Sequence, residues 1–323
     1  MCTWNGEQYL REQLASIAAQ TQAPDELIVC DDKSSDETVR IISEFANSAP
    51  FPVHLHVNEQ NLGSTRNFAQ AISLCKGDII VLCDQDDVWL PGKLAQLEAE
   101  FERAPNVGLI FTDAEIIDEA GSPVGNTLWE QLPLRPAERK RLRTKRAIDE
   151  LMPGSLVTGA TMAFRSRFKE LVLPIPHDLP IIHDAWIALL VAAVSEVLPL
   201  PTPLIRYRQH RGQQIGALER KDAGLVQRFD AESVQEALRR ENPYDEALAV
   251  ARAVRLRLLE QGQAFATRDA LTRLERRIAH LEARSSLPRA RLLRAPRVLR
   301  ELITLRYHRC SNGFQSAVKD LLA

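Results

Sequence analysis

The stretch GDIIVLCDQDDVWLP, residues 77–91, decides how this chain is expected to fold. Its first half is almost wholly apolar, which is typical of a strand buried on both faces of a sheet. Asp84, Asp86 and Asp87 then follow within four residues. Like charges so close together are unfavourable unless a cation joins them. The sequence therefore predicts a buried strand that delivers carboxylates to one edge of a sheet, where Mg²⁺ or Mn²⁺ binds.

Two ordinary structures also explain three clustered acids. One is the capping of a helix that starts beyond Pro91, and the other is a solvated turn. A calcium-binding EF-hand loop fits poorly, because Val88 stands where an oxygen ligand is expected and Trp89 where the loop needs glycine.

Apolar runs alternate with helical patterns around this stretch. The expected strands are 27–30, 53–57, 77–82 and 107–111, and the expected helices are 36–45, 66–74 and 94–101. This alternation predicts an α/β fold with a mostly parallel sheet and helices on both faces. Ligands of such sheets bind at the carboxyl ends of the strands, where the acidic turns fall.

A second acidic turn, Asp31 and Asp32, follows the first expected strand. Ser35 or Asp36 is sufficient to cap the next helix, which leaves the pair Asp31 and Asp32 unexplained. Carboxylates in this position can accept hydrogen bonds from a pyrimidine imide or from a ribose. The turn therefore favours a nucleotide as ligand.

The composition places further bounds on the protein. With 323 residues, 45% hydrophobic and 26% charged, the chain is expected to be globular rather than disordered or fibrous. No apolar run is long enough to span a membrane, and residues 1–10 do not resemble a secretory signal, so the sequence as given predicts a cytoplasmic protein. Five cysteines without C-x-x-C spacing favour reduced thiols.

Charge divides the chain into two halves. Residues 1–134 hold 7 Lys and Arg against 22 Asp and Glu, whereas the remainder holds 34 against 21. The basic stretch 134–149 is expected to be a solvated helix face or a mobile loop. After an extended segment at 204–208 the composition becomes helical over 218–283, which places a domain boundary near Gly216 and divides the chain into 1–216 and 217–323.

The segment 285–309 contains seven arginines and a single acid, Glu301, interleaved with leucines. Pro288 and Pro296 are expected to break it into short pieces. Such a basic amphipathic segment can lie on an anionic membrane surface, or it can pack its apolar stripe on the rest of the protein. Nucleic acid is not expected as a partner, because the front half is acidic and no aromatic residues interleave with the arginines.

The chain resembles family 2 glycosyltransferases of the GT-A fold, and most closely a rhamnosyltransferase-like subgroup that makes bacterial surface polysaccharides. One departure is that only Met1 precedes the Cys-Thr-x-Asn turn, so the first strand of the family is expected to be truncated. The resemblance rests, in chain order, on Thr3, Trp4, Asn5, Asp31, Asp32, Asn61, Gly63, Arg66, Asp84 to Asp87, Thr158 to Thr161, His183 to Trp186, Tyr207 to His210, Tyr307, Ser311 to Gly313 and Lys319 to Leu322.

The resemblance implies roles for residues that would bind the donor. Thr3 would lie by the nucleotide and Asp32 would contact the base, with Asp31 as a structural neighbour. Arg66 would reach the ribose or the diphosphate. Asp84 would contact the ribose, Asp86 would bind the metal, and Asp87 is an alternative metal ligand.

It also implies roles near the reaction centre. Asp184 would be the catalytic base, with capping of the helix 186–194 as the alternative. His183 beside it is expected to pack or to support a neighbouring site residue rather than to be a ligand. Arg208 and His210 would contact the diphosphate or form part of a lid, and Gly159 would shape the acceptor side.

The resemblance thus implies an inverting, metal-dependent glycosyltransferase. It would move a sugar from dTDP-rhamnose or a UDP-sugar to a lipid-linked or growing saccharide in O-antigen or capsule synthesis, peripherally at the cytoplasmic membrane. Two alternatives stay open. A sugar-phosphate nucleotidyltransferase would need an early glycine-rich loop, whereas Gly6 is the only early glycine. A non-catalytic scaffold with a degenerate transferase domain is favoured by the short first strand and disfavoured by the full set of acids.

Overall fold

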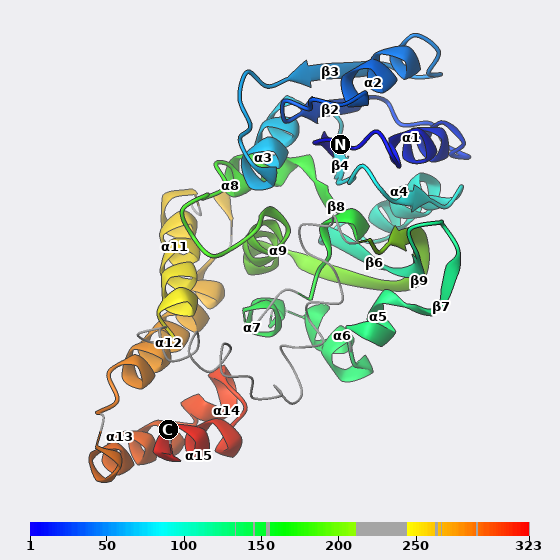
Figure 1. The fold of residues 1–323 in the computed structure, drawn as a ribbon. Coiled ribbons are helices and arrows are strands. Elements are labelled where there is room, and N and C mark those ends of the chain that lie inside the picture. Colours follow the sequence, from blue (N-terminus) through cyan, green and yellow to red (C-terminus); the bar gives the residue numbers. More distant parts are fainter. Residues whose placement is uncertain are drawn as a thin grey trace.

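The computed structural model describes residues 1–132, 134–144, 146–152, 156–210, 244–261, 264–265, 267–288 and 290–322. The expected boundary near Gly216 and the first part of the expected helical region lie outside these residues. Figure 1 shows the two sheets in the N-terminal part of the chain and the C-terminal helices at one side of them.

The first sheet contains three parallel strands in the order β1-β2-β3. Strand β2 is buried at every position, because its Leu-Ile-Val-Cys run is covered by helices. The strands and helices expected at 27–30, 53–57, 36–45 and 66–74 are confirmed to within two residues, and β1 is indeed short. The elements are β1 (Cys2–Thr3), α1 (Leu10–Ala18), β2 (Leu27–Asp31), α2 (Thr38–Ala46), β3 (Val53–Val57) and α3 (Ser64–Leu74).

The second sheet has the order β4-β8-β6-β9-β5, with β7 paired to β6. Only the pair β6 and β9 is parallel, while the other pairs are antiparallel. The α/β class is confirmed, but the expectation of a mostly parallel sheet holds only for the first sheet. Its strands are β4 (Ile79–Val81), β5 (Val88–Trp89), β6 (Val107–Ile117), β7 (Pro123–Thr127), β8 (Met162–Arg165) and β9 (Glu196–Arg208).

Hydrophobic patterns did not reveal this difference for a physical reason. A buried strand is apolar whichever way its chain runs, so its direction depends on which neighbours it meets. Strands β5 and β8 are only two and four residues long and gave no recognisable signal. Strand β6 extends six residues beyond the expected end at 111, because β9 pairs with it along its length.

The two sheets meet where β1 and the chain after β4 lie side by side. The Cys2 N–H donates to the Cys83 carbonyl at 3.3 Å, and the Leu82 N–H donates to the Met162 carbonyl of β8 at 3.0 Å. Helix α9 (His183–Val194) packs against α3 and β6, and ten of its twelve residues are buried. The carboxyl ends of β1, β2 and β4 and the first turn of α9 therefore converge.

Short helices cover the second sheet. The sequence predicted the basic stretch 134–149 to be a solvated helix face or a mobile loop. In this stretch, Arg141 forms a bidentate ion pair with Glu150 at 2.6 and 2.9 Å. The short helices are α4 (Lys93–Arg103), α5 (Leu128–Gln131), α6 (Pro136–Leu142), α7 (Ala147–Leu151), the 3₁₀ turns η1 (Gly159–Thr161) and η2 (Ser166–Phe168), and α8 (Lys169–Val172).

The C-terminal part is helical, as expected. Helices α11 and α12 pack against each other, and α11 contacts α8 and α9. Pro296 lies inside α13, so the expected break there is wrong: the ring removes one main-chain hydrogen bond without ending the helix. The helices are α11 (Asp245–Gln261), α12 (Arg268–Ser285), α13 (Arg291–Ile303), α14 (Arg306–Cys310) and α15 (Phe314–Leu322).

The structure also tests the expectations for the cysteines and for membrane-spanning helices. All five cysteines are free thiols. Among the described residues, no helix combines the length and the apolar character that crossing a bilayer requires.

Candidate functional site

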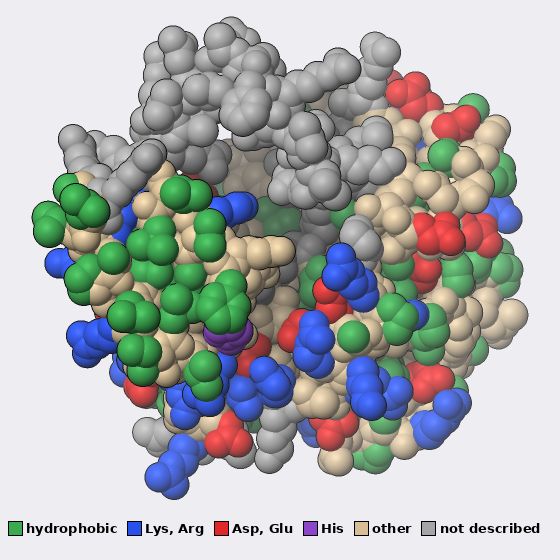
Figure 2. Space-filling view, turned by 90° about the horizontal axis from the view of Figure 1, so that it is seen from below, with side chains coloured by type: hydrophobic (Ala, Val, Ile, Leu, Met, Phe, Trp, Pro, Cys, Tyr) green, Lys and Arg blue, Asp and Glu red, His purple; other side chains and the backbone are tan. Residues whose placement is uncertain are grey.

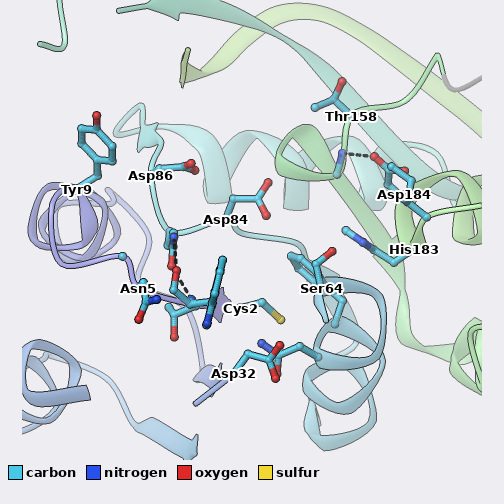
Figure 3. Close-up of a pocket in the computed structure, with 18 of the residues that line it drawn as sticks. Cys2, Asn5, Tyr9, Asp32, Ser64, Asp84, Asp86, Thr158, His183 and Asp184 are labelled. Carbon is cyan, nitrogen blue, oxygen red and sulfur yellow. Dashed lines mark hydrogen bonds between the residues drawn. The ribbon is translucent and has the colours of Figure 1, made fainter. Parts of the chain in front are cut away.

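A cavity of about 920 Å³ opens where the two sheets meet, and we call it the main cavity. Its lining comes from the ends of β1 and β2, the start of α3, residues 84–86, the first turn of α9 and the end of β9. Figure 3 shows that Asp32, Asp84, Asp86 and Asp184 reach it from three segments of the chain: the end of β2, the loop after β4 and the start of α9.

Asp32 lies at the end of β2 in a tightly defined position. Its carboxylate accepts hydrogen bonds from the backbone N–H groups of Leu62 and Gly63 at 2.7 and 2.8 Å, and from the side-chain amide of Asn58 at 2.9 Å. Gly63 has a φ of +80°, a conformation that side chains disfavour, and this lets the turn close over the carboxylate. The side chain is thus held rigidly at the cavity wall.

Thr3 also lines the cavity, but its hydroxyl is directed to a neighbour. It donates to Asp31 at 2.8 Å, and Asp31 in turn accepts from both the N–H and the hydroxyl of Ser34. Asp31 is fully buried. This network ties β1 to the turn after β2, which agrees with the structural role expected for Asp31.

Asp84 and Asp86 face the main cavity together. No hydrogen bond reaches the Asp84 carboxylate within the described residues, and burial, together with the charges of Asp86 and Asp184, raises its pKa to about 7. The Asp86 carboxylate contacts the ring Nε2 of His210 at 2.9 Å, and the His210 ring packs on Tyr9 with centroids 4.9 Å apart. The cavity therefore gathers more negative charge than its protein neighbours balance.

Asp87 points the other way, although it adjoins the same cluster. It is 1% exposed, does not line the cavity, and accepts the backbone N–H of Arg208 at 3.0 Å with one oxygen. Its other oxygen is buried without a hydrogen-bond partner, and burial raises its pKa well above the ordinary value. Asp87 therefore does not face the cavity, where the sequence analysis expected it as an alternative metal ligand.

Arg208 is buried beneath the loop rather than exposed in the cavity. Its guanidinium donates to the backbone carbonyl of Asp86 at 2.8 Å, to those of Asp118 and Glu119 at 3.3 Å, and to the Glu12 carboxylate. These contacts occupy the guanidinium group and hold the loop of residues 84–87 in place from the protein interior. The structure therefore gives Arg208 a supporting role in place of the expected contact with the diphosphate.

Arg66 does not line the main cavity either. It is exposed on α3, immediately before the cavity residue Asn67. A helix presents successive residues about 100° apart, which explains why a residue next to a lining position can face solvent.

Asp184 lies in the first turn of α9 and lines the cavity. The helix begins at His183, and its N-cap residue is Ile182. Asp184 therefore does not cap this helix. The carboxylate accepts the backbone N–H of Gly159 at 3.0 Å. A Cβ on Gly159 would lie 3.1 Å from Nε2 of His183, tighter than an ordinary contact, so glycine favours this close approach.

His183 does pack, as expected, but it also faces the cavity. Its ring stacks on Phe68 with centroids 3.9 Å apart, and both ring nitrogens are buried without a hydrogen-bond partner. Burial lowers its pKa to about 3, so the ring is neutral and offers one donor and one acceptor. Figure 3 shows the ring directed toward Ser64 at the cavity wall.

Lys93 is a buried residue that the sequence analysis did not single out. Its ammonium donates to the Ala160 carbonyl at 3.0 Å and lies 4.1 Å from the centre of the Trp89 ring. Burial lowers its pKa to about 8, against the opposing effects of Cys83, Asp87 and Asp84. A lysine at the start of an amphipathic helix is ordinarily exposed, so the sequence held no signal for this place.

The residues present fit a divalent cation only in part. Within the described ranges, no three His, Cys, Asp or Glu side chains converge into a complete metal site. Mg²⁺ is commonly held by one or two carboxylates and by substrate phosphates. Asp84 and Asp86 match this mode, because they are crowded and face the cavity, and no Lys or Arg of the described residues lines it.

The chain belongs to glycosyl transferase family 2, because the model of that family matches residues 1–171, more than half of the sequence. The match includes Asp32 and the acid cluster and ends before Asp184 and His210. The family inferred from the sequence motifs is therefore confirmed.

Known relatives match parts of the chain. An uncharacterised protein of Mycobacterium tuberculosis is 29% identical over 212 residues, 64% of this chain and 57% of its own. The UDP-Glc:alpha-D-GlcNAc-diphosphoundecaprenol beta-1,3-glucosyltransferase WfgD of Escherichia coli is 31% identical over 36% of this chain and 45% of its own. The dTDP-rhamnosyl transferase RfbG of Shigella flexneri is 35% identical over 29% and 34%. The chain thus spans less than two thirds of each relative.

Among solved structures, residues 1–349 of S. aureus TarS in complex with UDP-GlcNAc superpose with a TM-score of 0.57. The identity is 15%, and the match covers 98% of this chain and 88% of that one. At this identity the likeness concerns the fold alone, and it confirms the GT-A architecture.

Replacing Arg208 separates a supporting role from a ligand contact. We expect Arg208→Met to lower the free energy of unfolding by about 3 kcal/mol, because it leaves buried carbonyls unpaired. Arg66→Met, at an exposed position, should change it by less than about 0.5 kcal/mol. Urea unfolding of both variants measures this. Unchanged stability of Arg208→Met with a loss of nucleotide binding would return Arg208 to the expected diphosphate contact.

Proposed function

We propose that this chain transfers a sugar from a nucleoside diphosphate sugar to a saccharide acceptor with inversion at the anomeric carbon. The observation that carries the proposal is the arrangement of four acids around one cavity. Asp32 is held at one wall, Asp84 and Asp86 are crowded on a cavity that no described Lys or Arg lines, and Asp184 approaches from α9. This arrangement provides separate places for a nucleotide, a metal-bound diphosphate and an attacking hydroxyl.

The nucleotide end of the donor would lie against β1 and β2. The fixed Asp32 carboxylate presents acceptor oxygens, which suit the imide N–H of uracil or thymine, and Thr3 lies beside it. Next along the cavity, Asp84 and Asp86 would hold Mg²⁺ or Mn²⁺, with Asp84 also within the region of the ribose. The bound ion would neutralise charge on the departing diphosphate. His210, which contacts Asp86, would lie at the diphosphate end of the site.

Asp184 would act as the general base. The backbone N–H groups of Gly159 and Ala185 donate to the two oxygens of its carboxylate and orient it at the cavity wall, where it would accept a proton. The acceptor oxygen would form a bond to the anomeric carbon as the bond to the diphosphate breaks, and the hydroxyl proton would move to Asp184. A single displacement of this kind inverts the configuration.

The donor and acceptor classes are the finer part of the proposal. The two partial relatives named for a UDP-glucose and a dTDP-rhamnose activity support a pyrimidine nucleotide, either dTDP-rhamnose or a UDP-sugar. The name of the first relative includes a diphosphoundecaprenol acceptor, which supports a lipid-linked or growing saccharide of bacterial surface polysaccharide.

Removal of the Asp184 charge tests the base. We expect Asp184→Asn to reduce turnover by roughly 100-fold or more while donor affinity changes little. Asp25→Asn, at an exposed position away from the cavity, is the matched control. A panel of UDP- and dTDP-sugars, followed by mass spectrometry, measures transfer. Full turnover by Asp184→Asn, or a product with retained configuration by NMR, would contradict this mechanism.

Removal of metal tests the roles of the clustered acids. We expect EDTA to weaken UDP binding by wild type, and Asp86→Ala to lose the gain in affinity that Mn²⁺ gives, by roughly 10- to 100-fold. Asp87→Asn should keep that gain, because Asp87 does not line the cavity. Calorimetry with and without Mn²⁺ measures both. UDP affinity that is indifferent to EDTA would rule out a metal-assisted donor site.

His183 provides a test of the acceptor side. We expect His183→Phe to keep the stack on Phe68 and the melting temperature, yet to lower kcat/KM about tenfold, because a substrate hydroxyl would lose a hydrogen bond. The exposed His177→Phe is the control. Unchanged kcat/KM in His183→Phe would mean that the ring only packs.

A further inference from the structure

Exposed apolar side chains are concentrated in helices α13 and α15 and at Leu305, which follows α13. Of the large hydrophobic residues that are exposed in the described part of the chain, five are spread over residues 4–259. The other eight lie close together in sequence and are Leu292, Leu293, Leu299, Ile303, Leu305, Phe314, Val318 and Leu322. Such a concentration is typical of a binding surface.

Helix α13 has two apolar faces. Val298 and Leu302 pack inward with Tyr307 and Ala317 in a small core. Leu292, Leu299 and Ile303 recur at helical spacing about 100° further round the helix, where they are 91, 57 and 74% exposed. The inner face accounts for folding, so the outer stripe has no structural role within the described residues.

Helix α15 repeats this arrangement. Phe314, Val318 and Leu322 are spaced at i, i+4 and i+8 and are 66, 51 and 60% exposed, whereas Ala317 packs inward. Helices α13 and α15 pack against each other, so both stripes belong to one compact unit. Figure 2 shows hydrophobic side chains gathered over this unit with Lys and Arg next to them.

The charge exposed on this unit is positive, because its acids are buried. Glu301 is 4% exposed and pairs with His280 at 2.7 Å and with Arg306 at 2.9 Å. Asp320 is 3% exposed and pairs with Arg284 at 2.7 Å. Between residues 290 and 322, the exposed charged side chains of the described part are Arg297, Arg300, Arg309 and Lys319.

We propose that the outer face of α13 and α15, the C-terminal face, binds the surface of an anionic lipid bilayer. Its leucines, Ile303 and Phe314 would enter the boundary between headgroups and acyl chains, while the arginines contact anionic headgroups. The helices are too short to span a bilayer and would lie in its plane. This inference goes beyond the proposed transfer reaction, since it assigns a partner to a surface outside the main cavity.

Charge decides between a bilayer and other partners. In a symmetric pair of copies, this face would set arginines against arginines, which is unfavourable. A nucleic acid would complement the arginines but would leave the leucine stripes without a partner, since stacking on bases requires aromatic rings. An anionic bilayer complements both the positive charge and the apolar area.

Vesicle flotation of the full chain tests the inference. We expect flotation with vesicles of phosphatidylcholine and phosphatidylglycerol, at least tenfold less with phosphatidylcholine alone, and loss at high salt. Leu299→Asp with Ile303→Asp should abolish it, and Arg300→Glu with Arg309→Glu should weaken it strongly. Leu256→Asp on α11 is the matched control, because Leu256 is 56% exposed and Leu299 57%. Melting temperatures should stay unchanged, since every substituted side chain is exposed.

Three outcomes would overturn the inference. They are no flotation by wild type, equal flotation with neutral vesicles, and flotation of Leu299→Asp with Ile303→Asp at the wild-type level. If wild type were instead a dimer in light scattering without lipid and these variants monomeric, the face would be an interface between copies. The flotation assay contains no sugar donor, so its failure leaves the proposed transfer reaction unaffected, and the variants should keep turnover with a soluble acceptor.

Discussion

Repulsion among carboxylates at the junction of the two sheets is the constraint on which the rest of the structure depends. Asp84 has its pKa raised to about 7 by burial and by Asp86 and Asp184, and Asp87 beside it is buried with one oxygen unpaired. The fold tolerates this crowding because buried cations lie on the protein side of the cluster. Lys93 lies between Trp89 and the Ala160 carbonyl, and Arg208 donates to the Asp86 carbonyl in the loop that carries the clustered acids. The cavity side has no such cation among the described residues, and this asymmetry is the physical basis of the cation site that we propose.

The same constraint explains why distant parts of the chain meet here. Strand β9 carries Arg208 to the loop after β4, while its next residues bring His210 to Asp86. The first turn of α9 brings Asp184 against Gly159, which has no side chain to prevent the approach. Each of these contacts fixes an acid by a donor that belongs to another element. The acids are therefore positioned before any ligand arrives, which is the condition for efficient electrostatic catalysis.

The elements that the sequence predicted well are those with a strong local pattern. The apolar runs that became β2 and β3 and the helices after them were found nearly to the residue, and the acid cluster was placed at the end of a buried strand. The pattern failed where the outcome depends on neighbours. Strand direction in the second sheet, the long pairing of β6 with β9 and the buried place of Lys93 all arise from contacts between segments far apart in sequence. The sequence held only a weak signal that Asp87 faces away from the cavity. Alternate residues of an extended chain face opposite sides, so Asp84 and Asp86 share one side and Asp87 faces the other.

The sequence by itself determined the family, the α/β class, the acid-rich front half and the arginine-rich, leucine-rich C-terminus. These are properties of composition, spacing and motif, which do not depend on how segments meet. Only the tertiary structure decided which acids share a cavity, because Asp32, Asp84 and Asp184 are far apart in the chain and come together through the packing of β2, β4 and α9. It also decided that Arg208 supports the site from below and that two leucine-bearing stripes face outward. The physical reason is that burial and hydrogen-bond partners are assigned between elements, and no local pattern encodes that assignment.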